Sequence, residues 1–416
     1  MSFPQMFLAE RKLESPRIED VRQAIITEMQ KLNLRSKVRS GMRIAITAGS
    51  RGITNNVLIL ETVASELKKY GASPFFIPTM GSHGGATADG QRHILQALGI
   101  TEQSVGCPII SQMDVVDLGR TKEGIPVYVD KVAVSADGIV VINRVKPHTE
   151  YKGEIESGLM KMMTIGLGKH KGGYTAHSYA VQLGYQVALP SVARMILQKA
   201  PIFFGLAVVE NAYDETAIVS AVEPGLFEET DKNLLKRARD FLPRLPFNNM
   251  DILIVNEMGK EISGTGIDTN IIGRVMFVGG PEPDWPKIIR IVVLDLTDKT
   301  CGSAIGVGLA DFVTRRLVNK IDYPVTYVNC FTAMTPEKGR IPVTGETDRE
   351  AIEWAFQTIG AVEPREARVV KIKNTLHLDR LYISRALVSE LKGKPEWIVS
   401  EQPGELAFNE AGDLLL

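Results

Sequence analysis

The chain has 416 residues, of which 44% are hydrophobic and 23% charged, and its formal net charge is −1. This length is enough for two or three domains with full cores. The balanced charge gives no electrostatic case for nucleic acid or a membrane as the main partner. Cys107, Cys301 and Cys330 are too few and too scattered for a disulfide framework or a thiolate metal site. The first residues show no secretory signal and no uncharged apolar run approaches about 18 residues, so we expect a cytoplasmic protein.

Short apolar runs alternate with helical patterns in the first part of the chain. This alternation is typical of α/β layers with a mainly parallel sheet. The expected strands are Met42–Thr47, Ser73–Pro78, Asp137–Asn143 and Phe203–Val209. The expected helices are Thr54–Tyr70, Ala88–Leu98, Glu156–Gly166, Pro190–Lys199 and Glu228–Phe241.

A second α/β unit is expected after the proline-containing segment Pro243–Asn249. We predict an N-terminal domain at 1–247, a C-terminal domain at 248–402 and an active-site cleft between them, with the tail at about 403–416 packing back on the N-terminal domain. The long glycine-bearing loop Gly259–Gly273 is of a kind that is often functional in compact domains. The expected elements of this second unit are strands at Asp251–Asn256, Ile288–Leu294 and Val369–Ile372 and helices at Gly302–Leu317 and Glu350–Ile359.

Polar residues follow three of the expected strands directly. These segments are Ser50-Arg51-Gly52, Gly81-Ser82-His83 and Pro147-His148. In open α/β folds functional residues lie at the carboxyl ends of strands. The three segments therefore predict one shared crevice.

Two of the histidines in these loops are candidate acid/base groups. His83 lies among glycines that let the backbone approach a ligand, and His148 follows a proline that stiffens its entry. Two such bases would serve opposite faces of one prochiral centre, as a racemase or epimerase requires. The alternatives are a turn histidine bonded to the backbone for His83, and a capping or solvent-facing residue for His148.

The window from Val145 to His177 holds three of the six histidines together with Lys161. Lys161 lies among leucine and methionine residues, where a lowered pKa would favour a covalent adduct, although an exposed lysine on an amphipathic helix is the commoner case. His177 and His170 offer imidazole nitrogens to a divalent metal. For His170, flanked by lysines, we favour a surface or anion-contacting loop.

Several charged residues are candidate ligand contacts. Arg51 has the geometry to bind a carboxylate or phosphate through both nitrogens, or it is a solvent-exposed residue at a helix start. Lys260, Asp268 and Arg274 belong to the long loop of the second domain, where they complete the site or only solvate the loop.

Taken in chain order, this set of residues resembles the nickel-dependent lactate racemase family, and the resemblance extends over most of the chain. It is carried by Arg51, Gly81-Ser82-His83, Pro147-His148, Ser157-Gly158-x-x-Lys161 and His177.

The resemblance implies two α/β domains and a nickel-pincer nucleotide, which is a pyridinium-3-thioamide-5-thiocarboxylate mononucleotide carrying nickel. It implies that Lys161 tethers this cofactor, that His177 ligates the nickel, and that His83 and His148 are the acid/base pair. Arg51, Ser157 and Gly158 are the further cofactor contacts that we expect, and the expected substrate contacts are Arg51, Tyr151, Lys260 and Arg274.

The reaction implied is the racemisation or epimerisation of a 2-hydroxy acid by reversible hydride transfer from Cα. This chain has Ala48-Gly-Ser50-Arg51-Gly52 and Ser157-Gly-Leu-Met-Lys161 where lactate racemase has Asp-x-Thr-Arg-Pro and Ser-Gly-Gly-Arg-Lys, so we expect a substrate other than lactate. The polar side chains of Glu150, Tyr151, Lys152 and Glu154 favour a sugar acid or a dicarboxylate. The expected partners are this substrate and the enzymes that make the cofactor.

Two other functions fit the same residues. One is a zinc- or iron-dependent hydrolase or lyase that uses His83, His148 and His177 directly as ligands. The other is a non-catalytic protein that binds anions through its glycine loops.

Overall fold

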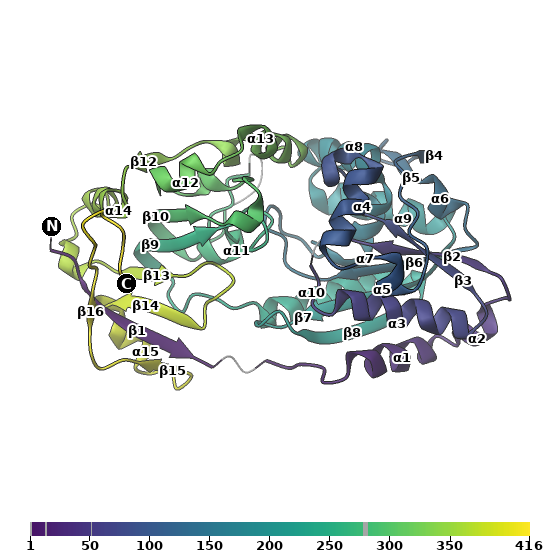
Figure 1. Cartoon of the computed structure of the whole chain (residues 1–416), viewed down its shortest axis with the longest axis horizontal. Coiled ribbons are helices and arrows are strands. Elements are labelled where there is room, and N and C mark those ends of the chain that lie inside the picture. The colour runs from purple at the N-terminus through teal and green to yellow at the C-terminus, as the bar shows by residue number, and fades with distance from the viewer. Residues whose placement is uncertain (1, 13–14, 51, 278–281) are drawn as a thin grey trace. The chain divides into compact units, whose positions relative to one another are not determined.

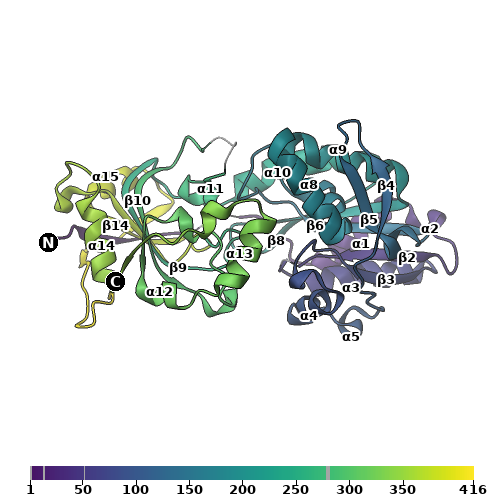
Figure 2. The same cartoon turned by 90° about the horizontal axis from the view of Figure 1, so that it is seen from above.

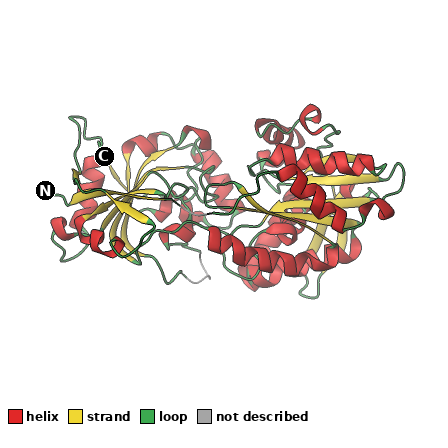
Figure 3. Ribbon diagram, turned by 90° about the horizontal axis from the view of Figure 1, so that it is seen from below, coloured by secondary structure: helices red, strands yellow, loops and turns green. Residues whose placement is uncertain are grey.

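The structure, a computed structural model, describes residues 2–12, 15–50, 52–277 and 282–416, and its contacts divide them into two compact units (Figure 1). The N-terminal unit consists of Ser15–His148 and Lys152–Leu242. The C-terminal unit consists of Pro243–Leu416, Thr149–Tyr151 and the described part of Met1–Glu14. In each unit the strands lie between helices (Figure 3). The predicted α/β class with mainly parallel sheets is confirmed.

The N-terminal unit alternates strands and helices along most of its length. Its strands are β2 (Arg43–Ala48), β3 (Ser73–Pro78), β4 (Val115–Arg120), β5 (Pro126–Asp130), β6 (Gly138–Arg144), β7 (Ile202–Glu210) and β8 (Thr216–Val222). Its α-helices are α1 (Val21–Lys31), α2 (Leu34–Lys37), α3 (Asn56–Lys69), α4 (Ala88–Ala97), α5 (Glu102–Val105), α6 (Lys131–Val134), α7 (Gly158–Lys161), α8 (Lys169–Leu183), α9 (Tyr185–Lys199) and α10 (Phe227–Phe241).

The main sheet of this unit has the strand order β3-β2-β6-β7-β8, with all neighbours parallel except β7 and β8. Alternate residues of β2, such as Ile44 and Ile46, are fully buried in a core that α1 and α3 complete. On the opposite face, Gly205 of β7 leaves room for Leu159 and Phe227, since a Cβ atom there would lie 2.6 Å from each side chain. Helices therefore cover both faces, which explains why these strands are apolar throughout.

The order of these strands creates a switch point at the carboxyl ends of β2 and β6. The chain passes from β2 outward to β3 on one side, and from β6 outward to β7 on the other. The loops that follow β2 and β6 therefore diverge, and in open α/β sheets ligands bind at such a point.

The C-terminal unit has a mixed sheet with the strand order β12-β11-β10-β9-β13-β14-β1-β15, and β16 pairs with β1. β9 to β13 run parallel, whereas β14, β1, β15 and β16 pair antiparallel. Its strands are β1 (Gln5–Arg11), β9 (Asn249–Met258), β10 (Lys287–Leu296), β11 (Phe312–Thr314), β12 (Val343–Gly345), β13 (Val369–Ile372), β14 (Arg380–Ser384), β15 (Trp397–Val399) and β16 (Gly404–Glu405). Its α-helices are α11 (Thr269–Ile272), α12 (Arg315–Asn319), α13 (Tyr323–Thr332), α14 (Asp348–Gln357) and α15 (Arg385–Leu391).

Both ends of the chain belong to the C-terminal unit (Figure 2), which differs from the predicted division. β1 lies between β14 and β15, with Met6 opposite Ser384. The tail that we expected on the N-terminal domain instead pairs β16 with β1 and buries Leu406 against the core of the same unit. Residues 2–12 and 403–416 were therefore assigned to the wrong domain, because strand pairing over such sequence distances leaves no local pattern.

Three expected elements differ in kind from the structure. Gly302–Leu317 is not one helix, because Gly302 and Gly306 have φ values of +77° and +94° and interrupt it before β11 and α12. The glycine-rich stretch around His170 is the helix α8 and not a loop. The expected helix Glu156–Gly166 is α7 followed by a π-helical turn, Met162–Leu167.

Two further expectations concern cysteines and membranes. Cys107, Cys301 and Cys330 are all free, which agrees with the absence of a disulfide framework. Across the described residues, no helix has the length and apolar character needed to span a membrane.

Lys371 on β13 is an unusual buried cation in the C-terminal unit. Its side chain is 4% exposed and its ammonium lies 5.1 Å from the centre of the Tyr382 ring. Burial, helped by the charge of Arg380, lowers the pKa of Lys371 to about 8. Among the described residues no carboxylate pairs with it.

We predict that Lys371→Met stabilises the C-terminal unit by about 1–2 kcal/mol at pH 7, because a buried charge is replaced by an apolar side chain of similar length. Above its unfolded pKa of 10.5 the lysine is neutral in both states, and its burial then carries no charge penalty. The penalty lowers the free energy of unfolding as the pH falls from 10.5, and it is complete below the folded pKa of about 8. Urea unfolding at pH 7 and pH 10 measures both effects. The exposed Lys373→Met is the matched control, and a variant at Lys371 that is less stable than wild type at pH 7 would contradict this reading.

Candidate active site of the N-terminal unit

The loops after β2 and β3 are joined by a hydrogen bond between two predicted site segments. Ser50 Oγ lies 2.6 Å from Nδ1 of His83. The backbone of the His83 loop is held by Gln91, a fully buried residue of α4 whose Nε2 donates to the carbonyl oxygens of Gly81 (2.9 Å) and His83 (3.3 Å). Hydrogen bonds therefore hold both the ring and the backbone of His83. Arg51, which follows Ser50, lies outside the described residues.

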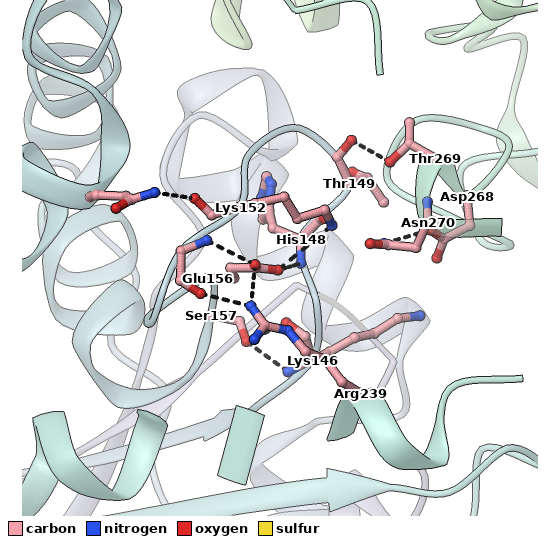
Figure 4. Close-up of polar contacts among 12 residues, drawn as sticks. Lys146, His148, Thr149, Lys152, Glu156, Ser157, Arg239, Asp268, Thr269 and Asn270 are labelled. Atoms are coloured by element: carbon pink, nitrogen blue, oxygen red, sulfur yellow. Dashed lines mark hydrogen bonds and ion pairs between the residues drawn. The ribbon is translucent and has the colours of Figure 1, made fainter. Parts of the chain in front are cut away.

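The loop after β6 holds His148 through its main chain (Figure 4). The backbone N–H of His148 donates to Glu156 Oε2 at 2.7 Å, and its carbonyl oxygen accepts from Lys152 Nζ at 2.8 Å. Lys152 Nζ also lies 3.8 Å from Glu156 Oε2. The peptide groups on both sides of the His148 side chain are therefore fixed by one ion pair.

Glu156 is the central acceptor of this loop. Its side chain is completely buried, and Oε1 accepts from the backbone N–H of Gly153 at 3.0 Å and from Nη2 of Arg239 at 2.7 Å. A buried carboxylate requires such charged and polar partners, because it has lost its hydration. Glu156 was not predicted, since its partner Arg239 is 83 residues away in sequence.

Ser157 and Gly158, both predicted as cofactor contacts, join the end of β6 to the start of α7. Ser157 Oγ accepts from the backbone N–H of Lys146 at 2.7 Å and donates to the carbonyl oxygen of Lys146 at 2.6 Å. Asn143 Nδ2 donates to the carbonyl oxygen of Gly158 at 2.7 Å. These bonds bring the His148 loop and the Lys161 turn to the same end of the sheet.

Asp231 of α10 caps the start of α7. Its two carboxylate oxygens accept from the backbone N–H groups of Leu159 (3.0 Å) and Met160 (2.8 Å). Burial raises the pKa of Asp231 to about 7, although both hydrogen bonds favour the charged form. Gly158 is required here, because its φ is +84° and a Cβ atom would lie 2.2 Å from Asp231 Oδ1.

Lys161 ends α7 and immediately precedes the π-helical turn, a feature often found at functional sites. This turn packs under the loops after β2 and β3. A Cβ atom on Gly49 would lie 3.2 Å from Met162 Cε, and one on Gly81 would lie 3.4 Å from Ile165 Cγ2. The residues next to Lys161 therefore contact the residues next to Ser50 and His83.

His177, the predicted nickel ligand, lies on α8. Its Nδ1 is 2.9 Å from the hydroxyl of the buried Tyr185, and the two rings meet edge to face. Histidine ligands of metals commonly have their other ring nitrogen held in this way. His170 is exposed on the same helix, which agrees with the expected surface position but not with the expected loop.

A buried ion pair that sequence reasoning missed supports the same region. Lys169 and Asp130 are both fully buried, with Nζ 2.9 Å from Oδ2, and Lys169 Nζ donates to the carbonyl oxygen of Pro78 at 2.6 Å. Burial lowers the pKa of Lys169, and Asp130 opposes this shift. Since Pro78 ends β3, the pair ties the start of α8 to the strand that leads to His83.

The predicted substrate contacts Tyr151, Lys260 and Arg274 all belong to the C-terminal unit. Tyr151 is buried, Lys260 Nζ contacts Asn329 Oδ1, and Arg274 pairs with Asp311 at 3.0 Å. Their role as substrate contacts stays a prediction.

The polar residues from which we inferred a larger substrate bind other parts of the protein. Glu150 pairs with the fully buried Lys338 at 3.3 Å, Lys152 binds the His148 loop, and Glu154 pairs with Lys232 at 2.9 Å. These contacts account for the three charges within the protein, and the sugar acid or dicarboxylate stays a prediction.

The described residues contain no group of three histidine, cysteine or acidic side chains arranged to hold a metal ion. The alternative in which His83, His148 and His177 ligate zinc or iron together therefore has no support from the side-chain arrangement.

The segments that carry His83, His148 and Lys161 are thus linked to one another at the carboxyl end of a parallel sheet. Residues 6–182 match the sequence model of a family described as the lactate racemase N-terminal domain. These residues are therefore a domain of the kind that this model describes.

Solved structures show the same fold at low sequence identity. The lactate racemase apoprotein from Thermoanaerobacterium thermosaccharolyticum is 12% identical, with a TM-score of 0.53 over 89% of this chain and 98% of that chain. A protein from Thermotoga maritima is 16% identical, with a TM-score of 0.50 over 68% of this chain and 72% of that chain. No curated protein matches the sequence.

We predict that Gly158→Ala destabilises the N-terminal unit by roughly 3 kcal/mol, because it combines a strained backbone with a clash against the Asp231 carboxylate. Gly124→Ala is the matched control, since Gly124 has a φ of +83° and a Cβ atom added there would meet no other atom within 4 Å. Thermal unfolding monitored by circular dichroism compares them. Equal losses of stability in the two variants would show that the contact with Asp231 is unimportant.

Asp231 also predicts a pH dependence of stability. The folded pKa of Asp231 is about 7 and lies above its unfolded value of 3.8. Its contribution to the free energy of unfolding is therefore complete below about pH 4 and is lost as the pH rises through 7. Asp231→Asn should therefore reduce the fall in unfolding free energy between pH 5 and pH 8 in urea titrations. The reading is wrong if wild type and variant lose the same free energy over this range.

Proposed function

We propose that the protein is a racemase or epimerase of a 2-hydroxy acid that works with a nickel-pincer nucleotide. The observation that supports this most directly is the lactate racemase N-terminal domain, because residues 6–182 include His83, His148, Lys161 and His177, the residues that we predict to move protons or hold the cofactor. The lactate racemase fold supports the same class of enzyme.

In this proposal His83 and His148 move the hydroxyl proton of the substrate. They follow β3 and β6, the two strands on either side of β2, so they approach the switch point from different loops. One histidine removes the hydroxyl proton on one face, and the other returns a proton after the planar 2-keto acid has formed. Ser50 orients the ring of His83, and Glu156 and Lys152 fix the backbone of His148.

The residues present fit the proposed cofactor. Lys161 supplies a primary amine for the covalent tether, and it directly precedes the π-helical turn. His177 supplies an imidazole whose Nδ1 is held by Tyr185, which suits a metal ligand. When bound, the cofactor would supply the acceptor and donor of the Cα hydride, while the protein orients the substrate.

The substrate is proposed only at the level of a 2-hydroxy acid. Arg51, Tyr151, Lys260 and Arg274 are the proposed contacts, and cationic groups among them suit a carboxylate. Lactate, malate and sugar acids therefore form the panel for the test below.

The decisive test follows chirality and deuterium at Cα. Protein produced together with cofactor-making enzymes is incubated in D₂O with each single-enantiomer acid of the panel. We expect one acid to lose its optical purity while its Cα hydrogen is retained, because a hydride returns to the carbon from which it left. Deuterium entering Cα at the rate of inversion would instead indicate a carbanion and would contradict the proposal.

We further predict that His83→Ala and His148→Ala each lower kcat by at least about 100-fold, because each removes a proton carrier. His93→Ala is the control, since His93 is exposed on α4 and lies outside the site. Steady-state kinetics on the acid that inverts gives the comparison. A variant of either site histidine that keeps kcat within a few-fold of wild type would remove that residue from the mechanism.

A further inference from the structure

One helix, α10, contacts both the Lys161 turn and the His148 loop through charged side chains. Asp231 and Arg239 are eight residues apart on this helix, which corresponds to about 12 Å along its axis. α10 is itself anchored in the core, because Phe227 and Leu235 are buried. The two side chains therefore project from a single rigid element.

At one end, Asp231 holds the start of α7. Its carboxylate accepts from two consecutive backbone N–H groups, those of Leu159 and Met160, and Lys161 follows directly. The first N–H groups of a helix have no partner within the helix, so this cap fixes where α7 begins.

At the other end, Arg239 holds the His148 loop through Glu156. Nη2 of Arg239 lies 2.7 Å from Glu156 Oε1 and 2.7 Å from the carbonyl oxygen of Gly153. The second oxygen of Glu156 accepts from the backbone N–H of His148. One guanidinium thus supports the carboxylate that binds His148 (Figure 4). It also closes the loop by binding the carbonyl oxygen of Gly153.

We propose that Asp231 and Arg239 are positioning residues. In this proposal α10 is the common frame that fixes the backbone positions of Lys161 and His148 relative to each other. The proposal deepens the proposed function, from which it takes the roles of tether and acid/base. The frame itself rests on contacts within the N-terminal unit and is testable without catalysis.

The test compares Arg239→Met with Arg194→Met. Arg194 also pairs with a glutamate of α10, Glu228, at 2.7 Å, but this pair is more exposed than Arg239–Glu156 and reaches the segment before Glu156 only indirectly, through Lys232 and Glu154. Hydrogen–deuterium exchange followed by mass spectrometry reads the peptide covering residues 146–153, and the peptide covering β2 is the internal reference.

We expect Arg239→Met to accelerate exchange of the 146–153 peptide at least tenfold while β2 exchanges as in wild type. Arg194→Met should leave both peptides unchanged, and Arg239→Lys should restore part of the protection because it keeps the charge. Unchanged exchange of 146–153 in Arg239→Met, or an equal acceleration of β2, would overturn the proposal.

The same method tests the other end with Asp231→Ala. Exchange at residues 158–161 should accelerate, whereas 146–153 keeps its protection because Arg239 is intact. If both peptides keep the protection of wild type in Asp231→Ala, the proposed role of Asp231 is overturned.

Kinetics then separates the two proposals. If wild type inverts a 2-hydroxy acid, Arg239→Met should lower kcat more than it changes KM, with partial rescue in Arg239→Lys. Equal kcat values in wild type and Arg239→Met, despite faster exchange, would show that the frame does not serve catalysis. If wild type inverts none of the acids and the exchange results are as expected, the proposed function fails while the frame stands.

Discussion

The arrangement of the site depends on one constraint, the parallel pairing of β2 with β6 while their following strands lie on opposite sides. Because both strands point the same way, their carboxyl ends share one edge of the sheet. Because the chain leaves them in opposite directions, the loops at that edge diverge. Ser50 follows β2, His148 follows β6 and His83 follows the neighbouring β3, so three separate segments reach the same edge.

Buried charges hold these loops in place. Glu156, Lys169 and Asp231 are nearly or fully buried, and each binds backbone groups of a segment that leads to a site residue. Burying a charge costs free energy, and the bonds to backbone and to opposite charges offset this cost. Apolar packing alone would stabilise the unit, but it would not fix the directions of polar loops. We therefore interpret these charges as the means by which the polar loops are fixed to the rigid sheet.

The sequence predicted the elements whose pattern is local. β3 and β13 were predicted with the bounds that the structure has, because short apolar runs between turn residues define them well. The loop positions of His83 and His148 followed from the same kind of pattern. What failed was long-range: β1 pairs with β14, whose residues lie about 370 positions later in the chain, and the Lys169–Asp130 and Arg239–Glu156 pairs also join distant segments. Periodicity carries no information about such pairing.

The glycines around His170 led to a wrong prediction of local structure. The stretch around His170 has the glycines of a loop, yet it forms α8, because Gly172 and Gly173 allow the helix to pack closely against Tyr128 and Gly81. The sequence holds one weak indication that Gln91 supports the His83 loop. Gln91 is polar, yet it lies on the same buried face of α4 as Leu95. Fully buried polar residues in a helix that follows a candidate loop are thus worth examining as supports for that loop.

We propose that Lys161 of the N-terminal unit is a covalent tether that works together with two acid/base histidines. The most direct measurement is the mass of the Lys161-containing peptide from protein made together with cofactor-producing enzymes. We predict an added mass corresponding to the pincer nucleotide on Lys161, and none on the buried Lys169. An unmodified Lys161 in protein that inverts a 2-hydroxy acid would contradict it.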